Sequence, residues 1–414
     1  MKYKITLELN SPMLIGGKKL NNDYIKSQEF VPGSVLRAAL SHEITERCDY
    51  YSDENNEKKH WVKYLDKDNC KTCSVKNLCK NFSEIKIGHC YPLNARSYPL
   101  TAMKCKNYST HEAFDTLIEK IKRKIALSDK GYKAESKAFV CPHPNCGERT
   151  ERYDGLYVSN DNKIEDIKLV YHLVTKNAIN PYLKVANDGA LYTLDTISDI
   201  VLLGNEEIKL SFEGIIEGEG LESDLKAIDT LHIGAYNTAG FGEVSLYSQI
   251  MKENDNVEQI ERRICEFNVD IKYGNKYYIP FTLKTDAYLG IEGSKEGKLY
   301  NIRTEEYIKV YEDILHQFIP SYMKLYNIIA SNDMRAGFDT SNMKARFRKN
   351  KIVTKAGSIF VFEVDKNLID YNELFKIQQR GLGENREHGF GQVTIAEDFH
   401  IKWRVKNGGN ENES

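Results

Sequence analysis

The sequence has no long apolar run and almost no net charge. No stretch of about 18 or more apolar residues occurs, so the sequence predicts no membrane-spanning helix and no membrane partner. The 58 basic and 60 acidic residues leave a net charge of -2, so any surface for nucleic acid has to be a local patch. The N-terminal residues enter a strand without the apolar segment of a signal peptide. We therefore expect a cytoplasmic protein.

The sequence also lacks a recognisable catalytic arrangement. No nucleophile–base pair or pair of carboxylates stands out, and no His-x-Glu pattern of the zinc deaminases accompanies the cysteines. His42, on a predicted helix, could serve a ribonuclease as general acid or base, but a surface histidine without a role is the simpler interpretation. The sequence favours a binding protein over an enzyme.

Cysteine is plentiful, and seven of the nine cysteines lie between Cys70 and Cys146. Such clustering, in a protein expected to be cytoplasmic, indicates metal binding rather than disulfides. Cys141 and Cys146 form a C-x₄-C pair, and Cys105 with His111 offers a matching C-x₅-H pair. Because a structural zinc ion takes four ligands, these residues are candidates for one structural Zn²⁺ site.

A second group of cysteines begins with the C-x₂-C pair of Cys70 and Cys73, followed by Cys79. Three candidates remain for a fourth ligand, namely Cys90, Cys48 and His60, and Cys90 is the nearest after the triplet. The alternative to two metal sites is one site with the remaining thiols buried and unligated.

Two glycine-rich stretches end in the same Gly-Phe-Gly. The second stretch, residues 381–391, brackets a polar insert with glycines, and Arg386 and His388 add donors to it. Consecutive backbone N–H groups in such a turn can cradle phosphate. The predicted RNA-binding glycines of the two stretches are Gly240, Gly242, Gly381, Gly383, Gly389 and Gly391.

The strands that open each half match as well. Tyr3, Ile5, Leu7 and Leu9 align with Tyr277, Ile279, Phe281 and Leu283, each pair 274 residues apart. An opening strand and a closing glycine loop, each occurring twice, predict an internal duplication. We expect a first domain over residues 1–250 with an insertion at about 49–155, a linker over 251–266, a second domain over 267–404 and a disordered tail over 405–414.

Two further stretches could contact RNA. Residues 335–351 alternate cations with an aromatic, which suits phosphate contacts and base stacking, although a solvated hairpin is the alternative. The residues in question are Arg335, Lys344, Arg346, Phe347, Arg348, Lys349 and Lys351. Gly33, Ser34 and Arg37 begin a predicted helix, with Ser34 as N-cap. The positive end of this helix could hold a phosphate. The alternative is an ordinary capped helix.

These features resemble a known family. The run Pro-Gly-Ser-Val-Leu-Arg-Ala-Ala-Leu at residues 32–40, with the duplicated unit and its glycine loop, looks like the RAMP superfamily of CRISPR-associated proteins. Further stretches are similar to the Csx-type RAMP subunit of type III-D effector complexes: residues 98–106, 111–117, 356–362 and 381–391, and the Cys141/Cys146 pair. The resemblance implies an α+β fold of two ferredoxin-like (RRM/RAMP) domains, with the cysteine-rich zinc-binding insertion in the first.

The resemblance also implies a role. The chain would grip the 5′ repeat-derived handle of the crRNA, cap one end of the ribonucleoprotein and contact the large polymerase-like subunit and the backbone RAMP subunits. It would meet target RNA only indirectly. Two rival functions stay open: an endoribonuclease that processes precursor crRNA with His42 or His388, and a backbone subunit that cleaves target RNA with a loop aspartate.

Overall fold

The computed structural model describes residues 1–16, 19–21, 24–48, 62–129, 138–160, 163–177, 179, 182–185, 191–251, 256–271, 274–290, 304–335 and 351–405. In these ranges the chain mixes helices and sheets, so the predicted α+β class is confirmed. It divides into two compact units: Met1–Arg96, Leu156–Lys252 and Glu387–Gly389 form the first, and Ser97–Gly155, Glu253–Arg386 and Phe390–Ser414 the second. No helix in the described ranges is long and apolar enough to cross a membrane.

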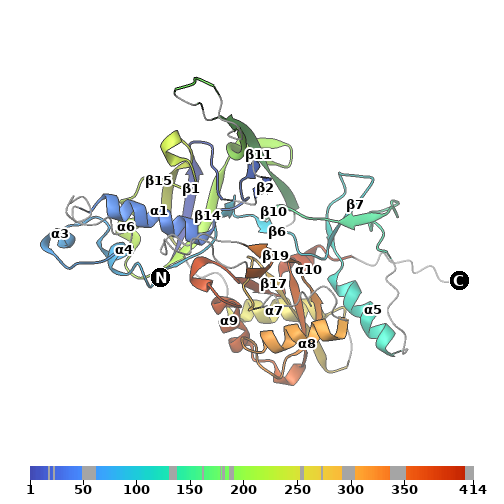
Figure 1. The fold of residues 1–414 in the computed structure, drawn as a ribbon. Coiled ribbons are helices and arrows are strands. Elements are labelled where there is room, and N and C mark those ends of the chain that lie inside the picture. The colour runs from blue at the N-terminus through green and yellow to red at the C-terminus, as the bar shows by residue number, and fades with distance from the viewer. Residues whose placement is uncertain are drawn as a thin grey trace. The chain divides into compact units, whose positions relative to one another are not determined.

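The central sheet of the first unit is antiparallel and has β1 (Lys2–Leu9) in its middle. β1 pairs with β14 (Ser211–Glu217) on one side and β16 (Glu243–Ile250) on the other. The outer strands are β15 (Thr230–His232) beside β16, and β4 (Lys86–Ile87) and β5 (Tyr91–Pro92) beside β14. Alternate residues of β1 are buried, as its apolar alternation predicts. Helix α1 (Gly33–Glu46) lies against this sheet and buries Leu36, Leu40 and Ile44 (Figure 1).

A second sheet in the first unit carries a long two-stranded arm. Its strands run in the order β2 (Lys19–Asn21), β3 (Tyr24–Lys26), β12 (Tyr192–Leu203), β11 (Lys163–Lys176), β10 (Leu156–Asn160) and β6 (Arg96–Ser97), with β13 (Glu206–Lys209) beside β12. β11 and β12 are the longest strands, and they form the arm visible in Figure 1.

The second unit repeats the order of the first. Its sheet runs β18 (Lys324–Ile329), β21 (Ile359–Asp365), β17 (Lys276–Leu283) and β22 (Val393–Ile395), with every pair antiparallel. Helix α8 (Thr304–Leu315) follows β17, and α9 (Tyr371–Arg380) follows β21. In the first unit α1 follows β1 and α6 (Glu222–Lys226) follows β14. In their sheets, β1 and β14 are central neighbours, as β17 and β21 are in the second unit. The predicted duplication is therefore present as a repeated order of elements.

The division into units differs from the predicted domains in three places, one of them residues 387–389, which were expected in the second domain and belong to the first unit. Residues 97–155, expected as part of an insertion in the first domain, belong to the second unit. The reason is that α5 (Leu117–Asp129) buries Leu117, Ile118 and Ile121 in the core built on β17 and β21. Residues 251–266, expected as a linker, contain most of α7 (Val257–Asn268), which buries Ile260 and Ile264 in the same core.

The cysteine-rich part of the second unit is built on a small sheet. β7 (Ala102–Cys105) lies between β8 (Phe114–Asp115) and β9 (Thr150–Arg152). A two-stranded pair of β19 (Asn332–Arg335) and β20 (Lys351–Thr354) and the short helix α10 (Asp398–Lys402) complete the unit. In the first unit, α3 (Asp68–Lys71) and α4 (Lys76–Lys80) carry the other cysteine group.

Candidate functional site

Two glycine-rich loops precede the last strands of the two sheets, and we name them the first loop (residues 233–243) and the second loop (residues 382–392). In the first loop, the N–H of Ala235 donates to the carbonyl oxygen of Leu14 at 2.8 Å. The N–H of Gly242 donates to the carbonyl oxygen of Pro12 at 2.9 Å. The loop is therefore fastened to the segment that follows β1.

The second loop makes the same bonds to the segment that follows β17. The N–H of Glu384 donates to the carbonyl oxygen of Tyr288, and that of Gly391 to Asp286, both at 2.8 Å. The two donors in the second loop lie 149 residues after the two donors in the first loop. The two acceptors lie 274 residues after their counterparts, which is also the spacing of the opening strands. The sequence predicted the repeat of strand and glycine loop, and the structure adds that the two are joined by the same hydrogen bonds.

The last glycine of each loop has no room for a side chain. Gly242 has a φ of +76° and Gly391 a φ of +70°, and a Cβ would collide with the carbonyl oxygen of Ile233 or Leu382 respectively. Both glycines therefore meet a conformational and a steric requirement, which explains the shared Gly-Phe-Gly.

Gly391→Ala is expected to destabilise the second unit by about 3 kcal/mol or more, because backbone strain adds to the overlap with Leu382. Gly274→Ala is the matched control: Gly274 lies in the same unit with a φ of +58°, but no atom lies within 4 Å of its Cβ position. The control should lose only about 1 kcal/mol. Chemical denaturation of both variants measures the difference, and equal losses would contradict a close-approach role for Gly391.

Aromatic rings and a lysine gather at the first loop. The Nζ of Lys176, the last residue of β11, lies 4.6 Å from the ring centroid of Tyr236 and 4.9 Å from that of Phe241. Tyr192, the first residue of β12, stacks on Tyr236 with ring centroids 6.4 Å apart. The hydrogen bond between the two tyrosines, with burial, raises the pKa of Tyr236. We name these four residues the aromatic–lysine cluster; all four are half-buried.

The second loop carries a similar set. The rings of Phe390 and Tyr288 lie 4.7 Å apart, and the Nζ of Lys351 lies 5.8 Å from the Tyr288 centroid. Lys351 also pairs with Glu384 at 3.1 Å. Phe390 is only 8 % exposed, so it contributes mainly to packing here.

Gly33 and Arg37 make structural contacts in the first unit, whereas Ser34 is exposed. The N-cap of α1 is Pro32 and not Ser34, because Pro32 already holds the extended conformation at φ -61° and ψ 141°. A Cβ on Gly33 would collide with the carbonyl oxygen of Ile87. The guanidinium of Arg37 donates to the carbonyl oxygens of Phe82, at 2.7 Å, and Ile85, and burial lowers its pKa. Arg37 therefore holds α1 to the segment after α4, and its phosphate contact stays a prediction.

The other predicted RNA-binding residues are placed only in part. Lys344, Arg346, Phe347, Arg348 and Lys349 lie outside the described residues. Arg335 and Lys351 are opposite each other in the β19–β20 pair. Arg386 is exposed in a short 3₁₀ turn, and His388 lies 3.8 Å from Glu387. The sequence missed Lys176 and Tyr192, because only the pairing of β11 with β12 brings them to the first loop.

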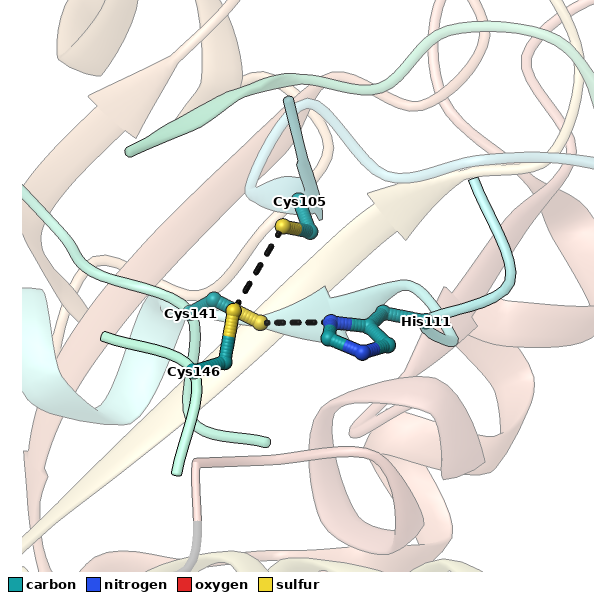
Figure 2. Close-up of side chains that lie close together, drawn as sticks. All are labelled: Cys105, His111, Cys141 and Cys146. Carbon is teal, nitrogen blue, oxygen red and sulfur yellow. Dashed lines mark hydrogen bonds between the residues drawn. The ribbon is translucent and has the colours of Figure 1, made fainter. Parts of the chain in front are cut away.

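A second candidate site lies in the cysteine-rich part of the second unit. Cys105 ends β7, His111 lies in the loop before β8, and Cys141 and Cys146 lie in the loop before β9. All four ligand atoms lie within 4.8 Å of one another, and Figure 2 shows the side chains pointing together. The pairing of β7 with β9 brings the loop of Cys141 and Cys146 to Cys105. Within that loop the N–H of Cys141 donates to the carbonyl oxygen of Glu148 at 2.8 Å.

The geometry of this centre suits a tetrahedral metal ion. The sulfur atoms of Cys105 and Cys146 are 3.8 Å apart, and Cys141 Sγ lies 3.4 Å from His111 Nδ1. A tetrahedral ion with Zn–S bonds of about 2.3 Å places two sulfur ligands about 3.8 Å apart, whereas a disulfide needs about 2.05 Å. The four residues that the sequence grouped as one site are thus brought together.

Backbone N–H groups bond to two thiols of this centre, and neighbouring rings stack on its histidine. Although burial raises the pKa of Cys105, N–H bonds from Asn107 and Tyr108 and nearby thiols outweigh it and lower that pKa. Burial dominates at Cys141 and raises its pKa to about 11, although the N–H of His143 bonds to it. The His111 ring stacks on His143 at 4.1 Å and on Tyr108 at 5.0 Å. Such outer contacts fix the orientation of metal ligands.

Within the described ranges, Thr282, His400 and Asp115 form a hydrogen-bonded arrangement that is fully buried. His400 on α10 lies between Asp115 and Thr282, with Nδ1 3.1 Å from Asp115 Oδ2 and Nε2 2.8 Å from Thr282 Oγ1. None of the three side chains is more than about 1 % exposed. No substrate can reach these atoms, so the arrangement is structural.

No protein-family model matches the chain, and no curated protein matches it. Among solved structures, a chain of the type III-B Cmr-beta complex bound to cognate target RNA aligns over 94 % of this chain and 96 % of its own length, at 10 % identity and a TM-score of 0.39. A chain of that complex bound to target RNA and AMPPnP covers 90 % and 92 %, at 9 % identity and a TM-score of 0.35. A crystal structure of Cmr4 covers 61 % and 100 %, at 11 % identity and a TM-score of 0.24. With TM-scores this low, an assignment of function depends on the residues of this chain.

Proposed function

We propose that the chain is a crRNA-binding RAMP subunit of a type III CRISPR effector ribonucleoprotein. The observation that carries the proposal is the glycine loop, built twice with the same hydrogen bonds to the segment after the opening strand. The motif resemblance over residues 32–40, 98–106 and 381–391 supplies the family. Together they favour a type III-D Csx-type subunit that grips the 5′ handle of the crRNA.

Both units are proposed to be ferredoxin-like. The order β-α-β-β-α-β with the first and third strands in the centre of an antiparallel sheet is the arrangement of that fold. In the second unit these elements are β17, α8, β18, β21, α9 and β22. In the first unit they are β1, α1, β4, β14, α6 and β16. The long chain between β4 and β14 contains the arm strands β11 and β12 and residues 97–155, which belong to the second unit.

The aromatic–lysine cluster is the proposed RNA contact of the first unit. The Lys176 ammonium can pair with a phosphate, and the faces of Tyr236 and Phe241 can stack on unpaired bases. Arg386 and the basic residues 344–349 would add phosphate contacts in the second domain. Because the net charge of the chain is -2, RNA binding requires a local surface of this kind.

The proposed role is binding and not catalysis. His42 lies 3.5 Å from Glu46 on the surface of α1, and their side chains are 71 % and 63 % exposed. No shielded acid–base pair of the kind that general catalysis uses is formed by these two residues. In the proposed complex the chain caps one end and contacts the large polymerase-like subunit and backbone RAMP subunits, and target RNA reaches it only through the crRNA duplex. A zinc ion held by Cys105, His111, Cys141 and Cys146 would be structural, because four protein ligands leave no position for water.

Lys176→Ala and the double variant Tyr236→Ala/Phe241→Ala are expected to weaken binding of an RNA that carries the host's repeat-derived 5′ handle. The lysine variant should lose one phosphate contact, which lowers the slope of affinity against salt by about one. The aromatic variant should lose about 1–3 kcal/mol per stacked base and keep its salt slope. Fluorescence anisotropy across a salt series measures both.

The control is Lys168→Ala, which removes an exposed lysine from the same strand, β11, away from the first loop. Equal affinity in all variants would contradict the proposal that the first loop contacts RNA. Cleavage of the RNA by the wild type that disappears in His42→Ala would instead favour the processing endoribonuclease.

A further inference from the structure

The two glycine loops repeat their backbone conformation as well as their hydrogen bonds. Three glycines of the first loop have a positive φ: Gly234 at +95°, Gly240 at +83° and Gly242 at +76°. Their counterparts 149 residues later do so too: Gly383 at +82°, Gly389 at +86° and Gly391 at +70°. Each loop also has a 3₁₀ turn at the corresponding place, Asn237–Ala239 in the first and Arg386–His388 in the second. The two loops are therefore one backbone design with different side chains.

One position of this shared backbone holds a tyrosine in the first loop and an asparagine in the second. Tyr236 has a φ of +63° and Asn385 a φ of +56°, so both lie in the left-handed region. Asparagine enters this region more readily than most residues, whereas a bulky side chain is an outlier there. Asn385 shows that the loop forms without a ring at this position. The backbone of the loop therefore does not explain the tyrosine.

The phenylalanine of each Gly-Phe-Gly has a different explanation. Phe241 and Phe390 occupy corresponding positions, so a packing requirement common to both loops accounts for them. Phe390, which is 8 % exposed, shows that this position is one for packing. Tyr236 has no such counterpart. Backbone outliers gather at binding sites, where the strain serves a contact outside the chain.

The surroundings of Tyr236 suit an unpaired nucleobase. Its ring is half-buried, so part of it is accessible to a ligand. Lys176 places its Nζ 4.6 Å from the centroid of this ring, and Tyr192 stacks on the ring at an interplanar angle of 25°. The 3₁₀ turn beside it carries no charge, whereas the turn of the second loop contains Arg, Glu and His. A base therefore meets a ring and a cation in the first loop without a neighbouring carboxylate in the turn.

We propose that Tyr236 is the residue on which the first loop stacks an unpaired RNA base, with Lys176 at the adjacent phosphate and Phe241 supplying the packing that both loops share. The inference rests on the proposed RNA-binding function and assigns the ligand of the first loop to one side chain. Because every base has a π-face, the contact tolerates a change of base and requires a single strand.

Tyr236→Asn tests the assignment, because it gives the first loop the residue that its counterpart already holds. The relief of backbone strain offsets the lost contact with Lys176, so the midpoint of thermal unfolding should stay within about 4 °C of the wild type. Affinity for a single-stranded RNA with the host's repeat-derived 5′ handle should fall about 5- to 150-fold, with an unchanged salt slope. Tyr236→Phe, which keeps the ring, should restore most of the lost affinity.

The matched control is Tyr247→Asn, which removes a tyrosine that is 54 % exposed on β16 of the same unit and should leave RNA affinity unchanged. Stacking itself is measured with the fluorescent base 2-aminopurine, placed at each position of the handle in turn. At one position the wild type and Tyr236→Phe should quench its fluorescence, and Tyr236→Asn should not.

Wild-type affinity in Tyr236→Asn, together with weaker binding in Lys176→Ala, would overturn this inference and leave the proposed function standing. Quenching at the same position in Tyr236→Asn as in the wild type would also overturn it. Wild-type affinity in both Tyr236→Asn and Lys176→Ala would contradict RNA binding by the first loop altogether.

Discussion

Cys141→Ser is expected to lose one zinc ion per chain and to unfold β9, the end of β7 and the loops that carry the ligands, while β8 and the remaining sheets stay folded. Structural zinc binding contributes about 10–16 kcal/mol in small zinc domains, and the ligands hold three otherwise short segments together. Only two- to four-residue strands and a few hydrogen bonds remain in this part once the ion is gone.

Hydrogen exchange resolves this local effect. Amides in residues 103–111 and 140–152 should lose their protection in Cys141→Ser, and those of Asp115, β17 and β21 should keep it. Cys265→Ser, on α7, and Cys79→Ser, in the other cysteine group, are matched controls that should leave residues 103–111 protected. Full protection of residues 103–111 in a metal-free preparation would contradict a structural role for the centre.

The sequence predicted best where the signal was local or repeated. The alternation of β1, the constant spacing of 274 residues and the pairing of Cys105 and His111 with Cys141 and Cys146 all appear in the structure. Each of these depends on residues whose types alone restrict the geometry: apolar alternation for a strand, glycine for a close approach, thiol and imidazole for a metal.

The sequence failed where partners come from distant segments. Residues 251–266 look like a linker because few of them are apolar, yet Ile260, Ile264 and Phe267 at helical spacing are enough to bury one face of α7. Nothing local in the sequence shows that the Arg37 guanidinium reaches the carbonyl oxygens of Phe82 and Ile85.

The buried pair of Asp115 and His400 is the other place where a single change should have a large effect. Asp115 accepts hydrogen bonds from Thr101 Oγ1 and from the N–H of Leu117, at 3.1 Å, besides facing His400. Burial lowers the pKa of His400, but the charge and hydrogen bond of Asp115, with the charge of Glu397, outweigh burial and raise it. The imidazolium and carboxylate thus hold β8, α10 and β17 together.

Asp115→Asn is expected to lower the free energy of unfolding of the second unit by about 3–5 kcal/mol, because it leaves His400 buried without its counter-charge. Asp270→Asn is the matched control: its ion pair with Arg404, at 3.1 Å, is partly exposed, so its loss should be about 0–1 kcal/mol. Equal losses in the two variants would mean that the buried pair contributes no more than a surface pair.

The pair also predicts the direction of a pH effect on stability. Since the folded pKa of His400 is raised above its unfolded value of about 6.5, the stabilisation is complete below that pH and is lost as pH rises through the folded pKa. Denaturation followed by the fluorescence of Trp403, in a Trp61→Phe background, reports on this region, because the Trp403 carbonyl accepts from the N–H of Asp115 at 2.7 Å. Wild type and Asp270→Asn should lose stability as pH rises from about 6 upward, whereas Asp115→Asn should show a flatter profile. A profile in Asp115→Asn as steep as in the wild type would show that another group is responsible for the titration.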